Sequence, residues 1–119
     1  LFAAAYLDRI RGNYSAARAG FDAFLQAYPT SALSDDARYW IGECHLAEGN
    51  PGEAAAQFAK VEREFPDSER VPAALLKLAT CRLELGEKAE ARKILTRIVE
   101  EHSGAVEASL AKEKLKQTD

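Results

Sequence analysis

A repeat with a fixed period is the feature that most restricts the fold of this chain of 119 residues. Gly12, Gly49 and Gly86 stand 37 residues apart. Two further sets keep the same register without a gap: Ala17, Ala54 and Ala91, and Phe21, Phe58 and Leu95. A period of roughly 20 to 50 residues is typical of solenoids, in which each unit buries its apolar face against its neighbours. We therefore expect any function to reside on a surface that the units share.

Each unit is predicted to contain two helices. Apolar residues recur at spacings of three and four, Ala is common, and β-branched residues are few before the third unit. In the second unit one stripe predicts the inward face of the first helix: Ala37, Ile41, Cys44 and Leu46. The pattern predicts helices at 1–11, 14–27, 33–48, 51–64, 70–85, 88–101 and 105–117.

The boundary between the two helices of the second unit has its own side-chain signals. Gly49 is expected to end the first helix, and Pro51 suits the first position of the next. Asn50 is expected to cap that helix, with Glu53 bonding back to the cap residue. Pro66 is expected to end it.

The final segment, 105–117, resembles the first helix of a fourth unit that has no second helix. We expect it to cap the array, because a solenoid needs a terminal unit with a polar outer face. The residues expected to cover the preceding pair are Val106, Leu110, Ala111 and Leu115. Those expected to stay in water are Glu107, Lys112, Lys114 and Lys116.

Small residues at two positions of each unit, followed by an aromatic residue and Pro, resemble the tetratricopeptide repeat family. The positions are Ala5, Gly42 and Ala79 in the first helices, and Ala17, Ala54 and Ala91 in the second. The resemblance implies an all-α, right-handed superhelix of three helix pairs plus a capping helix. It also implies a single domain at 1–119, with repeats at 1–33, 34–70 and 71–104 and the cap at 105–117. The usual unit has about 34 residues, and the extra residues fall in the connections PTSALS and PDSERV.

Within that family, the segments YPTS, ARYWIGECHLAEGN and FPDSERVPAALLKLATCRLELGE look like the C-terminal domain of the Tol-Pal system coordinator family, YbgF or CpoB. This resemblance implies a periplasmic protein of Gram-negative bacteria that contacts the Tol-Pal envelope machinery during cell division. It also implies trimers formed by a coiled coil outside this fragment. A tetratricopeptide lipoprotein of outer-membrane protein assembly is the related alternative.

Composition narrows the classes of partner. The chain begins at Leu1, contains no Met and shows no signal peptide, so we expect it to be part of a longer protein. No apolar run approaches the ~20 residues of a membrane span.

The charge of the middle unit bears on the class of partner. Residues 35–71 hold nine acidic and four basic side chains. Nucleic acid binding needs a clustered basic face, so we expect a protein partner with some positive charge instead.

No catalytic or metal motif is present in the sequence, and we expect neither enzyme activity nor a cofactor. Cys44 and Cys81 occupy the same position in successive units. Equivalent atoms of neighbouring units should be about 10 Å apart, beyond the ~7 Å limit for a disulfide. We therefore expect two buried thiols. His45 follows Cys44 directly, so the two side chains point about 100° apart and cannot chelate a metal together.

The resemblance places a binding groove on the first helix of each unit. Carried over position by position, the groove residues are Phe2, Tyr6 and Arg9, then Tyr39, Glu43 and Leu46, then Leu76, Thr80 and Leu83, with Trp40 and Lys77 at the border. Core packing is an equally good interpretation of Leu46, Leu76 and Leu83. Exposed aromatic and Arg side chains are typical of interaction hot spots, and they are expected at Tyr6, Arg9, Tyr39 and Trp40, beside Glu43.

These observations predict a non-catalytic scaffold that docks protein segments of the Tol-Pal type in its concave groove. Self-association through the groove or through an uncapped end is one alternative. Recruitment of substrates to a larger enzyme is another.

Overall fold

The structure is a computed structural model that describes residues 1–118. These residues form seven α-helices and no strand. The helices are α1 (Phe2–Ile10), α2 (Tyr14–Ala27), α3 (Ser34–Ala47), α4 (Pro51–Glu64), α5 (Val71–Glu84), α6 (Lys88–Glu101) and α7 (Val106–Gln117). Every predicted helix is present, and each of its ends lies within one residue of the predicted position.

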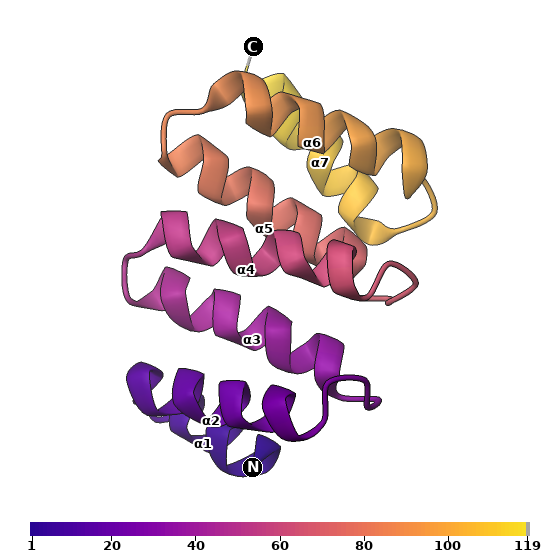
Figure 1. Ribbon diagram of the computed structural model, residues 1–119. Helices are drawn as coiled ribbons and strands as arrows, with labels where there is room; N and C mark the ends of the chain where they lie inside the picture. The colour runs from indigo at the N-terminus through magenta and orange to yellow at the C-terminus, as the bar shows by residue number, and fades with distance from the viewer. Residues whose placement is uncertain (119) are drawn as a thin grey trace.

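The helices stack in chain order, as Figure 1 shows, with α1 and α2 at one end of the array and α6 and α7 at the other. Each helix packs against the next, and α7 also reaches back to α5. The molecule measures 41 by 28 by 19 Å. The prediction of an all-α array of helix pairs with a capping helix is confirmed. No helix within residues 1–118 combines the length and the apolar character needed to cross a bilayer.

The repeated glycines end the first helix of each pair. Gly12, Gly49 and Gly86 have φ angles of 81°, 81° and 78°, a conformation that side chains with a Cβ rarely adopt. At the end of α3, the Gly49 N–H donates to the Leu46 carbonyl at 3.0 Å, and the Asn50 N–H donates to the His45 carbonyl at 2.9 Å. The first helices of successive pairs therefore end 37 residues apart in the sequence, each at a glycine with a positive φ angle.

The predicted side-chain cap of α4 is wrong. Asn50 precedes the helix, but its side chain makes no capping hydrogen bond. The Asn50 N–H donates to the His45 carbonyl at the end of α3. The ψ angle of Asn50, 72°, departs from the extended geometry of most N-cap residues. Glu53 does not bond back to Asn50 either, because its Oε2 lies 3.3 Å from Nδ1 of His45. Pro51 does occupy the first turn, as predicted.

Small residues are required where the helices of a pair cross. All six predicted crossing positions are buried: Ala5, Gly42, Ala79, Ala17, Ala54 and Ala91. A Cβ added to Gly42 would lie 2.8 Å from two ring carbons of Phe58. Interiors are packed too closely to absorb such an overlap without movement, so the aromatic ring of α4 fits only above a glycine.

The capping helix α7 covers the array with a different stripe from the one predicted. Ala108 and Ala111 are buried and Leu115 is partly buried against the core, whereas Val106 is 71% exposed and Leu110 is 49% exposed. The assignment of Val106 and Leu110 to the covering face is therefore wrong. Ala108, Ala111 and Leu115 share one side of the helix at spacings of three and four. Lys112 and Lys116 are exposed as predicted, but Glu107 and Lys114 are half-buried.

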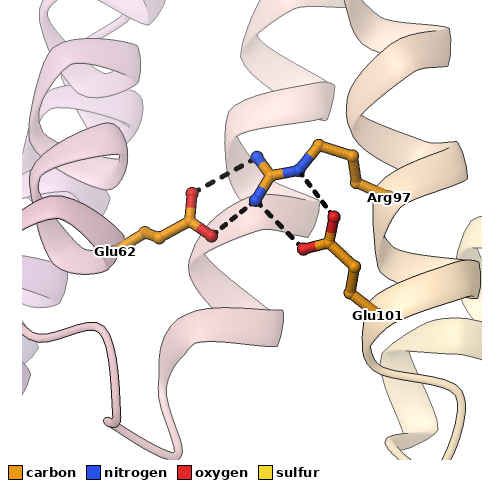
Figure 2. A network of polar contacts seen from close by, with 3 residues as sticks. All are labelled: Glu62, Arg97 and Glu101. Atoms are coloured by element: carbon orange, nitrogen blue, oxygen red, sulfur yellow. Dashed lines mark hydrogen bonds and ion pairs between the residues drawn. The ribbon is translucent and has the colours of Figure 1, made fainter.

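A polar network links the second helices of adjacent pairs. Figure 2 shows Arg97 of α6 between Glu62 of α4 and Glu101 of its own helix. The guanidinium donates to both oxygens of Glu62, at 2.6 and 3.3 Å. Hydrogen bonding to Glu62, and then to Glu101, raises the pKa of Arg97 above its ordinary value. The contact fixes α4 relative to α6 on their polar sides.

Candidate protein-binding groove

Trp40 of α3 lies at the centre of a row of aromatic rings. Its ring meets Tyr6 of α1 edge-on at 5.5 Å between centroids, and it meets Tyr39 at 5.4 Å. The guanidinium carbon of Arg9 lies 4.1 Å from its centroid, and that of Arg70, at the start of α5, lies 5.3 Å away. Trp40 is partly exposed. The sequence placed Trp40 at the border of the groove, whereas in the structure it lies in the middle of this surface.

Tyr39 is buried, contrary to the expectation of an exposed binding residue. Its side chain is only 6% exposed, and its ring meets Phe58 of α4 at 5.4 Å. The Arg70 guanidinium lies 4.8 Å from its centroid. Burial, with a smaller contribution from the charge of Glu43, raises the pKa of Tyr39 to about 12. Tyr39 thus belongs to the core, and it supports Trp40 from beneath.

One cleft lies where the C-terminal ends of α1 and α3 meet the start of α2 and the middle of α5. Its volume is about 600 Å³. It is lined by Arg9, Ile10, Tyr14, Glu43, Leu46, Ala47 and Lys77. The structure therefore brings together four predicted groove residues: Arg9, Glu43, Leu46 and Lys77. Ile10, Tyr14 and Ala47 were missed, although Ala47 stands one residue after Leu46.

Glu43 is the polar group of this cleft with unused bonding capacity. Its side chain is 17% exposed, and its Oε1 lies 3.4 Å from Nζ of Lys77. The contact is an ion pair without a hydrogen bond: Oε1 is shielded from solvent and has no hydrogen-bond partner within residues 1–118. A shielded carboxylate oxygen gains stability from an added donor. Glu43 thus pairs with Lys77 in this cleft and keeps hydrogen-bonding capacity that no described residue fills.

A second cleft of about 550 Å³ lies between the N-terminal ends of α3 and α5. It is lined by Ala32, Asp35, Asp36, Glu69, Arg70, Ala73 and Glu107. Asp36 accepts a hydrogen bond from Nε of Arg70 at 2.7 Å, so part of its charge is already neutralised. The remaining carboxylates suit a basic side chain. The sequence prediction missed this cleft, although its acidic residues cluster in and after the connections between repeats.

The third unit contributes fewer residues to the two clefts than the sequence predicted. Thr80 donates from Oγ1 to the Leu76 carbonyl of its own helix at 3.1 Å, and Leu76 packs partly buried against the core. Leu83 is partly buried and lines neither cleft. Core packing is thus the better interpretation of Leu76, whereas Leu46 does line the first cleft. Phe2 packs edge-on against Phe21 and Phe24 beneath the groove.

The two thiols are buried, as predicted. Cys44 and Cys81 are free cysteines with no exposed surface. Burial raises the pKa of both thiols to about 11, so they are held as weakly reactive neutral groups. Within residues 1–118, no cluster of His, Cys, Asp and Glu side chains is arranged to hold a metal ion.

Comparison with known families and proteins gives two kinds of match. Two family models, both described as tetratricopeptide repeat, match residues 2–69 and 46–115. The cell division coordinator CpoB of Pseudomonas putida strain KT2440 is 42% identical over 38 residues, and so is a second CpoB from Pseudomonas putida. In each case the match covers 32% of this chain and 14% of the relative. The aligned segment is thus a small part of either relative.

Proposed function

Because the chain belongs to the tetratricopeptide repeat family, we propose that it is a non-catalytic module that binds a segment of a partner protein on the surface around Trp40. We call this surface the Trp40 groove; it consists of Trp40 and the two clefts beside it. Trp40 itself is the observation that carries the proposal. Trp and Arg dominate the energetics of protein interfaces, and here a partly exposed Trp stands between Arg9 and Arg70.

The chemistry of the two clefts supports a proposal for the side chains that the partner segment carries. Glu43 offers a shielded oxygen on one side of Trp40. Asp35, Glu69 and Glu107 add carboxylates on the other side. A segment with an apolar or aromatic residue over Trp40 and a Lys or Arg on each side would satisfy both clefts. The acidic balance of the middle unit would also speed its approach.

We further propose that residues 1–119 act as one domain of the Tol-Pal coordinator type, in the periplasm of a Gram-negative bacterium. In that setting the Trp40 groove docks envelope proteins that take part in cell division. The identity of 42% over 38 residues with CpoB supports this assignment. The aligned segment spans 14% of that relative. The trimers and the partners of a whole coordinator protein are therefore proposals for this chain.

Affinity capture from a Gram-negative envelope extract tests the function. The baits are the parent protein, Trp40→Ala, Glu43→Gln and an outer-surface control, Lys93→Ala, whose side chain is 75% exposed on α6. We expect a protein that is captured by the parent and by Lys93→Ala and is depleted on the two groove variants. Melting curves must show that the variants are folded. Equal capture by all four baits would contradict the Trp40 groove as the binding surface.

A further inference from the structure

The two guanidinium groups beside the Trp40 ring differ in their partners. Arg70 donates from Nε to Asp36 at 2.7 Å, so the protein itself supplies its anion. Arg9 lies closer to the ring, 4.1 Å from its centroid, but it forms no hydrogen bond or ion pair with a carboxylate of residues 1–118. A guanidinium stacked on an aromatic ring can still bind a carboxylate through its N–H edge. Arg9 is therefore a half-buried cation without an anionic partner.

The two clefts of the Trp40 groove carry opposite charge. The first cleft is lined by two cations and one carboxylate: Arg9, Lys77 and Glu43. The second cleft is lined by four carboxylates and one cation: Asp35, Asp36, Glu69, Glu107 and Arg70. Helix α3 contributes to both clefts, with α1 and α5 beside it at the first and α5 and α7 beside it at the second. The groove is thus positive at one end and negative at the other.

The carboxylates of the second cleft are not equivalent. Asp35 and Asp36 each accept a hydrogen bond from a side chain of the protein. Glu69 and Glu107 form no hydrogen bond or ion pair within residues 1–118. These two carboxylates are therefore the ones that remain free to pair with a cation of a partner.

The distance between the two ends is short. One face of α3 carries, at spacings of four and three residues, Asp36, Trp40 and Glu43. A rise of seven residues along an α-helix is about 10 Å, which about three extended residues can span. A short segment can thus reach both clefts while it covers Trp40.

We propose that the Trp40 groove binds a partner segment with an ordered charge pattern: an acidic side chain beside a basic one at the first cleft, an apolar residue over Trp40, and a basic side chain at the second cleft. The acidic side chain pairs with Arg9, and its basic neighbour fills the free capacity of Glu43. The second basic side chain pairs with Glu69 and Glu107. Reversing the segment would bring like charges together, so the groove binds it in one orientation. This inference rests on the proposed function and specifies the partner of the same surface.

Selection from a random peptide library displayed on phage tests the pattern. The folded parent protein is the target, and phage that bind folded Trp40→Ala are removed first. We expect the selected peptides to share an acidic residue near a basic one, then an apolar residue, then a second basic residue. Selected peptides that are basic at both ends and lack the acidic residue would contradict the charge pattern and leave the proposed function standing. A library without any peptide that depends on Trp40 would overturn both.

Fluorescence anisotropy with a selected peptide measures the contribution of Arg9. Replacing the acidic residue of the peptide by its amide should weaken binding to the parent about three- to five-fold, the effect of one partly exposed ion pair. Arg9→Gln in the protein should remove that difference, and Arg9→Lys should restore part of it. Lys93→Ala on the outer surface of α6 should leave the difference unchanged. If the amide still weakened binding to Arg9→Gln by the same factor, the pairing with Arg9 would be wrong.

The same peptide tests the second cleft through its distant basic residue. Replacing that residue by Gln should weaken binding to the parent by a similar factor, and the double variant Glu69→Gln, Glu107→Gln should remove this difference. The effect of the acidic residue should persist in the double variant, because Arg9 lies at the other end of the groove. A double variant that removed the effect of the acidic residue, and kept that of the basic one, would reverse the assignment of the two ends and refute the proposed orientation.

Discussion

The guanidinium carbon of Arg9 in α1 lies 4.1 Å from the centroid of the Trp40 ring in α3. The first helices of two successive pairs are thus joined through a cation–π contact at the centre of the groove. Arg70 adds a second guanidinium at 5.3 Å. A Trp held in this way loses little rotamer freedom when a partner binds, which suits a surface that acts by presenting a fixed anchor.

Arg9→Ala should expose Trp40. We expect the fluorescence of Trp40, the one tryptophan in the chain, to shift to the red and to be quenched more strongly by acrylamide. The free energy of unfolding should fall by about 0.5–1 kcal/mol, the worth of an accessible cation–π contact. Arg63→Ala on the exposed surface of α4 is the control. Quenching that stays at the parent level in Arg9→Ala would show that Arg9 does not shield the ring.

Gly42→Ala and Gly52→Ala should have opposite effects on stability. Replacing a helical glycine by alanine normally stabilises by up to about 1 kcal/mol. At Gly42 the added Cβ would lie 2.8 Å from the Phe58 ring, whereas at Gly52 it would meet nothing within 4 Å. Overpacking at Gly42 should outweigh the gain and lower the free energy of unfolding by about 1–3 kcal/mol. Urea unfolding measures both. A stabilised Gly42→Ala would mean that α3 and α4 do not cross closely there.

Leu110→Asp and Ala111→Asp test which face of α7 covers the array. Ala111 is buried, whereas Leu110 is 49% exposed. Ala111→Asp should bury an unpaired charge, cost several kcal/mol and lower solubility by opening the end of the core. Leu110→Asp should change stability by no more than about 0.5 kcal/mol. If thermal melting found a loss in Leu110→Asp as large as that in Ala111→Asp, Leu110 would belong to the covering face, as the sequence predicted.

Stability should decline at alkaline pH. Burial raises the pKa of Cys44 and Cys81 from 9.0 to about 11, and that of Tyr39 from 10.0 to about 12. The folded state keeps these protons to higher pH than the unfolded state does. The stability that these three groups contribute is therefore fully present below pH 9. The contribution of the thiols is lost as the pH rises from 9 to 11, and that of Tyr39 as it rises from 10 to 12.

Urea unfolding under reducing conditions measures this dependence. Each thiol can contribute a slope of at most about 1.4 kcal/mol per pH unit. The double variant Cys44→Ala, Cys81→Ala should start from a lower stability but show a flatter decline between pH 9 and 10. An identical slope in parent and variant would mean that the thiols do not carry the effect.

The helices were predictable because their ends are set by local chemistry. Gly12, Gly49 and Gly86 stop the first helices, and Pro51 starts a second one. Such signals act within a few residues, so they can be read without tertiary information. The prediction that Asn50 caps α4 failed because its backbone N–H is hydrogen-bonded to the end of α3. The sequence pattern does not show that one residue must take part in both helix ends.

The groove was predictable in register but not in depth. The resemblance placed Tyr39 in the groove, yet the depth of its side chain depends on Phe58 of the neighbouring helix. Similarly, the second cleft joins residues from α3, α5 and α7, and Arg70 reaches Trp40 from the turn that starts α5. Contacts between helices decided these features, and a single sequence does not display such contacts.

The burial of Tyr39 also determines which variants probe binding cleanly. Truncating Tyr39 would open the core beside Phe58, so a loss of binding could reflect a loss of structure. Trp40 and Glu43 are more accessible and are the better choice. Lys93→Ala, remote from both clefts, serves as the matched control.

Calorimetric titration of a purified envelope partner into the double variant Trp40→Ala, Glu43→Gln is the most direct test of the Trp40 groove. We expect the variant to bind at least about ten-fold more weakly than the parent, and the loss to approach 2 kcal/mol, the scale of a hot spot. Lys93→Ala should bind like the parent, and melting should confirm that both variants are folded. Parent-like affinity in the folded double variant would contradict the account and exclude the Trp40 groove as the site of docking.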